Sequence, residues 1–379
     1  MCRIRGNFRL KATFVLSSLG AGGAERVAAH LVNEWAARDE QVMLILTYSE
    51  VSQFAYSIPS TVTIVALADI PGCRGRSVAA RIRRLTALRR ALVAQRSDVV
   101  ISFLTDVNVA TLLACIGLRV RVVVSERTHP PLCKLAAFWR SLRWLLYRRA
   151  DRIVMLSQKS LVWLQDNIPD AKGVVIPNPV VFPLPEHSPV VDVIRYVPTE
   201  TKLIVGVGRL DSAKQFDHLL RAFAASNAHR LGWHLVILGN GPCRNALSDL
   251  GRAIQIGDQL HLPGSVGNMG AWYARADIFV MTSSFEGFPN ALVEAMSYGV
   301  PPIAYDCDTG PSEIIDHQMN GILVRPMGNE LALSVAISTL VDDEDMRHRM
   351  GNAALSVRQT YSPERVLAMW DEVLSVGSN

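Results

Sequence analysis

The sequence has no long hydrophobic run, no C-x-x-C motif and no low-complexity tract. No stretch approaches the ~18 uninterrupted apolar residues that a membrane-spanning helix needs, so we expect a soluble or peripheral protein. The six cysteines, at positions 2, 73, 115, 133, 243 and 307, have no metal-ligand spacing. Their distribution argues against a disulfide scaffold and favours a reduced, cytoplasmic compartment.

The sequence also lacks a G-x-G-x-x-G fingerprint. A glycine-rich turn at residues 20–25 follows the first expected strand and opens a helix, which suits close approach to a phosphate or sugar. No acidic residue closes a second strand about 20 residues further on, which disfavours a dinucleotide-binding fold.

Apolar residues make up 49% of the 379 residues, enough for a full core and two or three domains. The net charge of +5 hides an asymmetry between the two halves. Residues 1–185 hold 25 Lys and Arg against 12 Asp and Glu, whereas residues 186–379 hold 14 against 22. A surface for an anionic partner is therefore expected in the first half.

Short apolar runs alternate with helical patterns along the chain. The expected strands are residues 13–16, 42–47, 62–65, 99–103, 121–125 and 152–156, then 202–207, 234–238, 260–262, 278–281, 302–305 and 322–324. Five prolines fall within residues 174–190, which indicates a linker between the two series. Continuous apolar strands between helices predict two doubly wound α/β domains that face each other across a cleft.

Two carboxylates, Glu286 and Glu294, lie in a loop and in the helix that follows it. Pro289 and Asn290 are good helix-start residues, and Gly299 can end the helix. The free N–H groups at such a helix start form a seat for phosphate, so one carboxylate could bind a sugar and the other a ribose. The alternative is that both are ordinary solvated glutamates.

Two cations, Arg209 and Lys214, follow the strand expected at residues 202–207. Arg209 can make a forked contact to phosphate oxygens and Lys214 a point-charge contact, which would stabilise a leaving diphosphate. The alternative is a solvated basic loop. Asp306 and Asp308 form a D-x-D, but this short motif is frequent by chance and we do not expect a metal there.

Several phrases, in this order, resemble the retaining GT-B glycosyltransferases of family 4 over nearly the whole chain. They are Gly22-Gly23-Ala24-Glu25-Arg26-Val27, Ile176-Pro177-Asn178-Pro179, Gly208-Arg209-Leu210 with Lys214, Gly239-Asn240-Gly241-Pro242, and Glu286 to Glu294 with Glu313-Ile314-Ile315 and Asn320-Gly321. The resemblance implies two Rossmann-like domains: residues 1–182 for the acceptor and 201–360 for the nucleotide-sugar donor. Residues 183–200 would link them, and a helix within 361–379 would pack back on the first domain.

The resemblance also implies roles for single residues. Glu286 would contact the donor sugar, Glu294 the ribose, and Arg209 with Lys214 the diphosphate, in place of a metal or other cofactor. The remaining donor-binding residues would be Gly22, Gly23, Gly208, Gly287, Phe288, Pro289 and Asn290. On the acceptor side, Glu126 would take the catalytic place where many relatives carry a His-Asp pair, with Arg127 and His129 as rivals. Gln215 stands where the family usually has Gly, and Asn240 where Asp is common.

Residues 125–129 and 308–313 resemble a narrower bacterial group that extends polyprenyl-diphosphate-linked oligosaccharides from UDP-sugars. Arginine-rich amphipathic patterns at residues 76–96 and 138–149 could contact the anionic inner leaflet, which would make the protein peripheral on the cytoplasmic face of the inner membrane. In the alternative, these arginines are solvated. No nucleic-acid-binding module accompanies them, so nucleic acid is not an expected partner. Other readings are an epimerase acting on free UDP-sugar and a non-catalytic nucleotide-sugar-binding protein.

Overall fold

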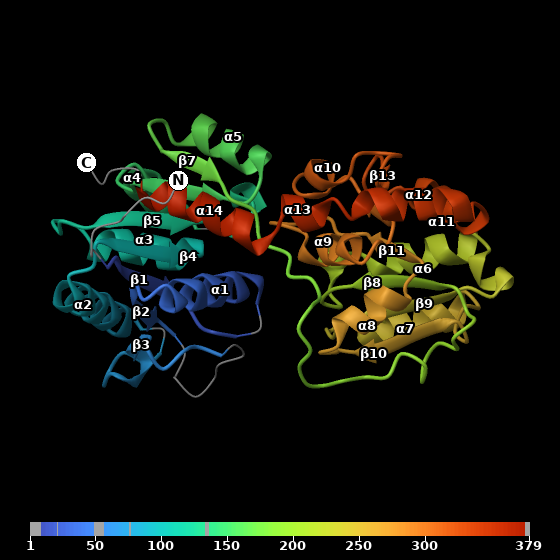
Figure 1. Cartoon of the computed structure of the whole chain (residues 1–379), viewed down its shortest axis with the longest axis horizontal. Helices are drawn as coiled ribbons and strands as arrows, with labels where there is room; N and C mark the ends of the chain where they lie inside the picture. Colours follow the sequence, from blue (N-terminus) through green and yellow to red (C-terminus); the bar gives the residue numbers. More distant parts are fainter. Residues whose placement is uncertain (1–8, 21, 49–56, 76, 133–135, 376–379) are drawn as a thin grey trace. The chain divides into compact units, whose positions relative to one another are not determined.

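A computed structural model describes residues 9–20, 22–48, 57–75, 77–132 and 136–375. The chain divides into two compact units, residues 1–177 with 367–379 and residues 178–366 (Figure 1). Each unit is built on one parallel sheet with covering helices, which confirms the expected α/β fold class. Cys2, Arg76 and Cys133 lie outside the described residues.

The first unit carries a sheet in the order β3-β2-β1-β4-β5-β6-β7. Its strands are β1 (Lys11–Leu16), β2 (Gln41–Leu46), β3 (Thr63–Ala66), β4 (Val99–Phe103), β5 (Arg121–Ser125), β6 (Arg152–Met155) and β7 (Gly173–Val175). Its helices are α1 (Gly23–Ala37), α2 (Val78–Gln95), α3 (Thr105–Ala114), α4 (Ala137–Tyr147) and α5 (Gln158–Asn167).

Successive strand residues in this unit pack on opposite faces of the sheet, because side chains alternate along a strand. On one face Phe14 contacts Trp35 of α1, with ring centroids 5.1 Å apart. Phe103 contacts Trp370 of the last helix, α14 (Pro363–Ser375), with centroids 6.0 Å apart. On the other face Val15 belongs to a core shared with α2, α3 and α4. Both faces are therefore covered, as the continuous apolar strands predict.

The second unit carries a sheet in the order β10-β9-β8-β11-β12-β13. Its strands are β8 (Leu203–Val207), β9 (His234–Leu238), β10 (Leu260–Gly264), β11 (Ile278–Met281), β12 (Pro302–Tyr305) and β13 (Ile322–Val324). Its helices are α6 (Phe216–Ala225), α7 (Arg244–Ala253), α8 (Met269–Arg275), α9 (Asn290–Ser297), α10 (Pro311–Ile314), α11 (Glu330–Asp342), α12 (Glu344–Ala354) and α13 (Val357–Thr360).

Each sheet has a switch point, where neighbouring strands lead into connections that run in opposite directions. The switch lies between β1 and β4 in the first unit and between β8 and β11 in the second. Ligands of open α/β sheets bind outside the carboxyl ends of the strands at such a point. The two switch points are therefore where functional side chains should be sought.

Every strand expected from the sequence is present, but two features near the domain boundary differ. Strand β7 was not predicted: it is three residues long and pairs in parallel with β6 at the sheet edge. Residues 183–200, expected as a linker, belong to the second unit. Val193 and Val197 in this segment are buried in a core with Leu203 and Val205 of β8, which gives an irregular segment a fixed place on the sheet.

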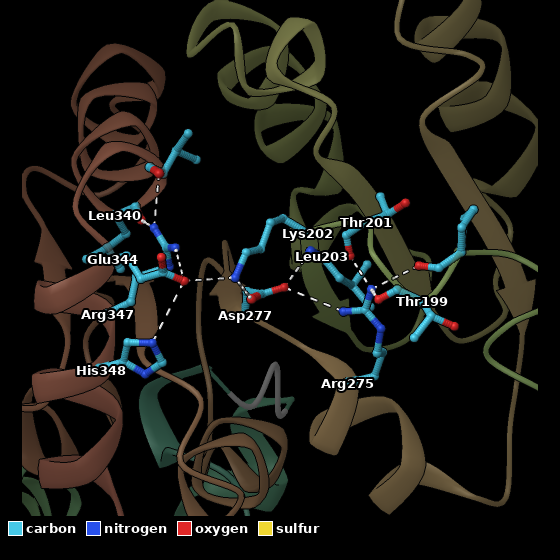
Figure 2. Close-up of polar contacts among 12 residues, drawn as sticks. Thr199, Thr201, Lys202, Leu203, Arg275, Asp277, Leu340, Glu344, Arg347 and His348 are labelled. Carbon is cyan, nitrogen blue, oxygen red and sulfur yellow. Dashed lines mark hydrogen bonds and ion pairs between the residues drawn. The ribbon is translucent and has the colours of Figure 1, made fainter.

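An ionic network joins the amino ends of β8 and β11 (Figure 2). The Lys202 ammonium lies 3.1 Å from an Asp277 carboxylate oxygen and 3.0 Å from one of Glu344. The other Asp277 oxygen accepts a hydrogen bond from the Leu203 amide at 2.8 Å. Arg275 lies 3.6 Å from Asp277. The network holds β8 and β11 together at their amino ends, whereas ligands of this fold class bind at the carboxyl ends.

Replacing Asp277 by alanine should lower the free energy of unfolding by about 1–3 kcal/mol, because the Leu203 amide loses its side-chain acceptor in a part-buried place. Denaturant unfolding measures the change. Replacing Glu344 is the matched control, since its ion pair with Lys202 is largely exposed and should contribute little to stability. Equal losses for the two variants would contradict a special role for Asp277.

No helix in the described part of the chain is long and apolar enough to cross a membrane. The four described cysteines, Cys73, Cys115, Cys243 and Cys307, are unpaired.

Candidate functional site

The residues predicted for the donor site in the second unit follow the two switch-point strands. Gly208 and Arg209 come directly after β8, and a 3₁₀ turn (Ser212–Lys214) follows them. Glu286 lies in the loop between β11 and α9. Because the carboxyl ends of parallel strands share one edge, the fold brings these two loops together.

Lys214 and Glu286 form an ion pair. The Lys214 Nζ atom lies 2.6 Å from Glu286 Oε1, and the two side chains are 24% and 14% exposed. The Ser283 hydroxyl donates to the same oxygen at 2.7 Å. Two donors therefore hold the Glu286 carboxylate in one orientation beside the cation. Sequence reasoning missed Ser283, whose position three residues before Glu286 was the available signal.

Hydrogen bonds tie the backbone of the two loops together. The Thr282 hydroxyl donates to the Lys214 carbonyl at 2.7 Å, and the Ser284 amide donates to the Ala213 carbonyl at 2.8 Å. The Thr309 hydroxyl, from the loop after β12, donates to the Glu286 carbonyl. The relative position of Lys214 and Glu286 is thus set by backbone contacts as well as by their charges.

Arg209, in the loop that leads to Lys214, extends into solvent. Its side chain is 74% exposed, and its Nε atom lies 3.6 Å from Asp211. An exposed ion pair of this length is weak, so the guanidinium can turn toward a ligand.

The turn formed by Gly239 and Gly241 supports the loop that carries Arg209. A β-carbon on Gly239 would lie 2.0 Å from the Gly208 carbonyl oxygen, and one on Gly241 would lie 2.2 Å from the Leu210 carbonyl oxygen. Only glycine fits this approach of two backbones. The Gly-Asn-Gly-Pro phrase is therefore a structural support for the site. Gly208 itself lies against the Lys214 side chain, where a β-carbon would be 3.2 Å from a methylene carbon.

Helix α9 begins at Asn290, and Gly299 follows it with φ +77°, as the start and stop residues predicted. Glu294 on this helix is 8% exposed, and its Oε2 atom accepts a hydrogen bond from the Tyr273 hydroxyl at 3.2 Å. Glu294 is therefore a buried carboxylate with a fixed orientation. Its expected contact to a ribose stays a prediction.

The residues between Glu286 and α9 have defined places. Gly287 is half-buried, and Phe288 packs edge-on against Tyr361 with ring centroids 5.5 Å apart. Pro289 lies so close to the loop after β12 that a β-carbon on Gly310, which has φ +101°, would be 2.7 Å from its ring. Asn290 accepts a hydrogen bond from the Asn178 amide at 2.9 Å. These contacts fix the start of α9 relative to Glu286.

Cys307 and Asp306 follow β12 at the same edge of the sheet. Burial, and next the charge of Glu286, raise the pKa of the Cys307 thiol to about 12, so it remains protonated and is a poor nucleophile at neutral pH. Asp306 forms an ion pair with Arg325 at 2.6 Å. The described residues contain no group of three or more His, Cys, Asp or Glu side chains that could hold a metal ion.

Gln215, which departs from the family pattern, lies directly after Lys214 with φ 46° and ψ 42°. A left-handed conformation strains any residue with a β-carbon, and the Gln215 Oε1 atom is buried without a hydrogen-bond partner. Gln215→Gly should therefore raise the free energy of unfolding by about 1 kcal/mol. Gln215→Ala is the control, because it removes the amide but keeps the β-carbon. Denaturant midpoints that rise equally in both variants would exclude backbone strain as the cause.

In the first unit, Gly22 and Gly23 mark the start of α1, after the switch-point strand β1. Gly22 is the N-cap residue, and a β-carbon there would lie 2.3 Å from the Glu25 carboxylate. Ser18 donates to Glu25 at 3.2 Å, which orients that carboxylate over the turn. The Glu25 carboxylate is the far end of a flexible side chain, so this contact alone does not require glycine at position 22. The role of both glycines toward the donor stays a prediction.

Glu126, the candidate acceptor-side residue, follows β5 and is only 2% exposed. Its carboxylate accepts hydrogen bonds from the Tyr147 hydroxyl at 2.5 Å and from the Thr105 hydroxyl at 2.8 Å. Asn108 in turn donates to the Tyr147 oxygen at 3.2 Å. The structure therefore places Glu126 inside a buried polar network, and its expected catalytic role stays a prediction. Tyr147 could not be found from the sequence, since only the packing of α4 brings it to β5.

The two rivals of Glu126 are also buried, each 8% exposed. The Arg127 guanidinium lies 4.7 Å from the centroid of the Phe103 ring, and burial lowers its pKa to about 9. The His129 Nδ1 atom lies 2.8 Å from the Ser160 hydroxyl.

Burial raises the pKa of Glu126, against the opposing effect of the Tyr147 and Thr105 hydrogen bonds. The folded state thus holds this proton more tightly than the unfolded state. The resulting stabilisation is complete below the unfolded value near 4.5 and is lost as the pH rises through the folded pKa. Glu126→Gln, which cannot ionise, should therefore gain stability relative to the native protein as pH rises from 4.5. Denaturant midpoints measured across this range test the shift, and a constant difference would contradict it.

Comparisons with known proteins agree with this architecture. A model of glycosyl transferases group 1 matches residues 194–357, and a model of glycosyltransferase family 4 matches residues 21–181. A Campylobacter jejuni enzyme named GalNAc-alpha-(1->4)-GalNAc-alpha-(1->3)-diNAcBac-PP-undecaprenol alpha-1,4-N-acetyl-D-galactosaminyltransferase is 27% identical, over 98% of this chain and 99% of its own. The amylovoran biosynthesis glycosyltransferase AmsD of Erwinia amylovora is 26% identical, over 94% of this chain and 96% of its own.

Solved structures share the fold at lower sequence identity. Sucrose-phosphate synthase from Thermosynechococcus elongatus superposes with a TM-score of 0.80 at 16% identity, over 96% of this chain and 98% of its own. HepE of Anabaena, solved in complex with UDP, gives a TM-score of 0.79 at 18% identity, over 97% of this chain and all of its own. With the two family models matching successive parts of the chain, these comparisons show that it belongs to the GT-B glycosyltransferases of the family 4 type.

Proposed function

We propose that this glycosyltransferase moves a hexose or N-acetylhexosamine from a UDP-sugar to a polyprenyl-diphosphate-linked saccharide, with retention of anomeric configuration. The observation that carries the proposal is the Lys214–Glu286 ion pair at the switch point of the second unit. It puts a cation for the leaving diphosphate next to a carboxylate that can accept hydrogen bonds from sugar hydroxyls.

Positive charge stabilises the leaving diphosphate best when it is already in position before the reaction, because no reorganisation is then needed. Lys214 is held in place by its own backbone contacts and by Glu286, and exposed Arg209 can add a forked contact. These groups support a mechanism without a metal ion. Glu294, buried on α9, is proposed to hold the ribose.

The kind of donor and acceptor is supported by the names of the relatives. Two Campylobacter jejuni relatives, each 27% identical, are named as N-acetylgalactosaminyltransferases acting on undecaprenol-linked or undecaprenyl-diphosphate-linked saccharides. AmsD is named for the biosynthesis of amylovoran. We infer that this chain works in the assembly of a lipid-linked saccharide or polysaccharide.

Two helices of the first unit support a position at an anionic membrane surface. Neither α2 nor α4 contains an acidic residue. Arg84 and Arg143 are buried. The other arginines of α2 and α4 are exposed, namely Arg81, Arg83, Arg89, Arg90 and Arg140. Trp144 and Leu145 of α4 are 43% and 56% exposed, which adds apolar contact area. We propose that these helices meet the cytoplasmic leaflet.

A panel of UDP-, GDP- and ADP-sugars with membrane lipid extract tests the proposal. We expect release of UDP that depends on the extract, together with a glycosylated lipid of retained configuration. Release of GDP without UDP would overturn the donor assignment. Conversion of the UDP-sugar to an epimer without any extract would instead identify an epimerase.

A further inference from the structure

A cavity of about 460 Å³ lies in the first unit between α2, α3 and α4. Thr47 and Tyr48, which follow β2, and Leu67, which follows β3, are among its lining residues. The cavity therefore opens near the carboxyl edge of the sheet, where ligands of this fold class bind. Its volume falls within the range of small-ligand pockets.

The wall of this cavity is mainly apolar. Each helix contributes side chains spaced three residues apart: Ile82 and Leu85 from α2, Val107 and Ala110 from α3, and Trp139 and Leu142 from α4. Residues three positions apart lie on the same face of a helix, so both side chains of each pair can line the cavity. Helix α3 contacts both α2 and α4 (Figure 1). All three helices contribute apolar side chains to the lining.

Apolar side chains also surround the mouth of the cavity. Val78 and Ile82 are 72% and 60% exposed, and Tyr48 is 56% exposed. Exposed apolar residues gathered at a cavity mark a binding surface more often than isolated ones do. The mouth is therefore suited to a ligand that continues from the cavity along the surface of α2.

Charge at the cavity favours an anion. Arg84 donates to the carbonyls of Cys73 and Gly75, each at 2.7 Å, and lies 4.5 Å above the Tyr48 ring, so it holds the wall in place. Arg81, one turn of α2 from Leu85, is exposed in the lining. Asp106 is the one acidic residue of the lining.

We propose that this cavity binds the first isoprene units of a polyprenyl-diphosphate acceptor, with Arg81 beside the diphosphate. The inference rests on the proposed function and adds a binding site for the lipid part of the acceptor. An apolar chain joined to a dianion matches an apolar cavity with an arginine at its mouth. A free saccharide would leave the apolar wall unmatched, and a neutral lipid would leave Arg81 unmatched.

Two acceptors that carry the same saccharide diphosphate, one on a geranyl group and one on a methyl group, test the proposal in buffer without vesicles or detergent. The native protein should show a KM for the geranyl acceptor at least about tenfold lower. Ile82→Glu, at an exposed position, should remove this preference, measured as the ratio of the KM values for the two acceptors. Val93→Glu is the matched control, because Val93 is also exposed on α2 but lies outside the cavity lining.

Binding of a fluorescent geranyl diphosphate gives a readout that does not need transfer. We expect the native protein and Val93→Glu to bind it and Ile82→Glu to bind at least about tenfold more weakly. Equal KM values for the two acceptors, or equal probe binding by the two variants, would overturn the inference. Probe binding that follows this pattern while no acceptor is glycosylated would refute the proposed function and leave the cavity assignment intact.

Discussion

Replacing Glu286 by alanine should lower kcat for glycosyl transfer by about 100-fold or more while the protein stays folded. The carboxylate is 14% exposed and receives hydrogen bonds from Lys214 and Ser283 on one oxygen. Its loss removes the group proposed to hold the donor sugar and also releases Lys214 from its fixed position. Initial rates with the donor identified in the nucleotide panel, at saturating acceptor, measure the effect.

Glu330→Ala is the matched control for Glu286. Glu330 lies on α11 of the same unit and also forms an ion pair, with Arg221 at 3.4 Å. Its loss should leave kcat unchanged. Circular dichroism and denaturant unfolding show whether Glu286→Ala keeps the fold. A folded variant with undiminished turnover would exclude Glu286 from the site.

Lys214→Ala should have an effect of similar size, about 100-fold in kcat, because the leaving diphosphate gains charge as its bond to the sugar breaks. Lys214→Arg should restore little of this activity, since a planar guanidinium cannot take the place of a compact ammonium 2.6 Å from Glu286. Steady-state rates over a range of donor concentrations separate kcat from KM.

The control for Lys214 is Lys202→Ala, which removes an ion-paired lysine directly before β8, at the amino end of the strand that leads to the Lys214 loop. It should change stability and leave kcat intact. The double variant that lacks both Lys214 and Glu286 should lose far less than the product of the single losses, because the two side chains act as a unit. Losses that multiply would mean that the two residues act independently.

The sequence predicted the strands well because they are continuous apolar runs between helices. Strand β7 was not predicted because the apolar run Val174-Val175-Ile176 is only three residues long and Pro177 follows it directly. Proline content indicated a linker within residues 174–190, and the family resemblance placed it at residues 183–200. Their attachment depends on Val193 and Val197 meeting the core beside β8, a long-range contact that local composition cannot reveal.

Site residues were predictable where a motif carried them and unpredictable where packing did. Lys214 and Glu286 were found as separate residues, and the structure brings them to 2.6 Å across 72 positions of sequence. The burial of Glu126 was not foreseen, because its partners Thr105 and Tyr147 lie 21 residues away on either side along the chain. Arg84 likewise looked like a surface cation, yet two carbonyls fix it inside the unit.

The Lys214–Glu286 ion pair makes each residue the counter-ion of the other. Under the proposed roles, an intact donor replaces both halves of this pair: its diphosphate meets Lys214, and its sugar hydroxyls meet Glu286. Inorganic phosphate, or the nucleotide left after transfer, can meet only Lys214 and would leave Glu286 with fewer hydrogen bonds in a part-buried place. The charge-balanced site would therefore favour the whole donor over its product, and so limit product inhibition.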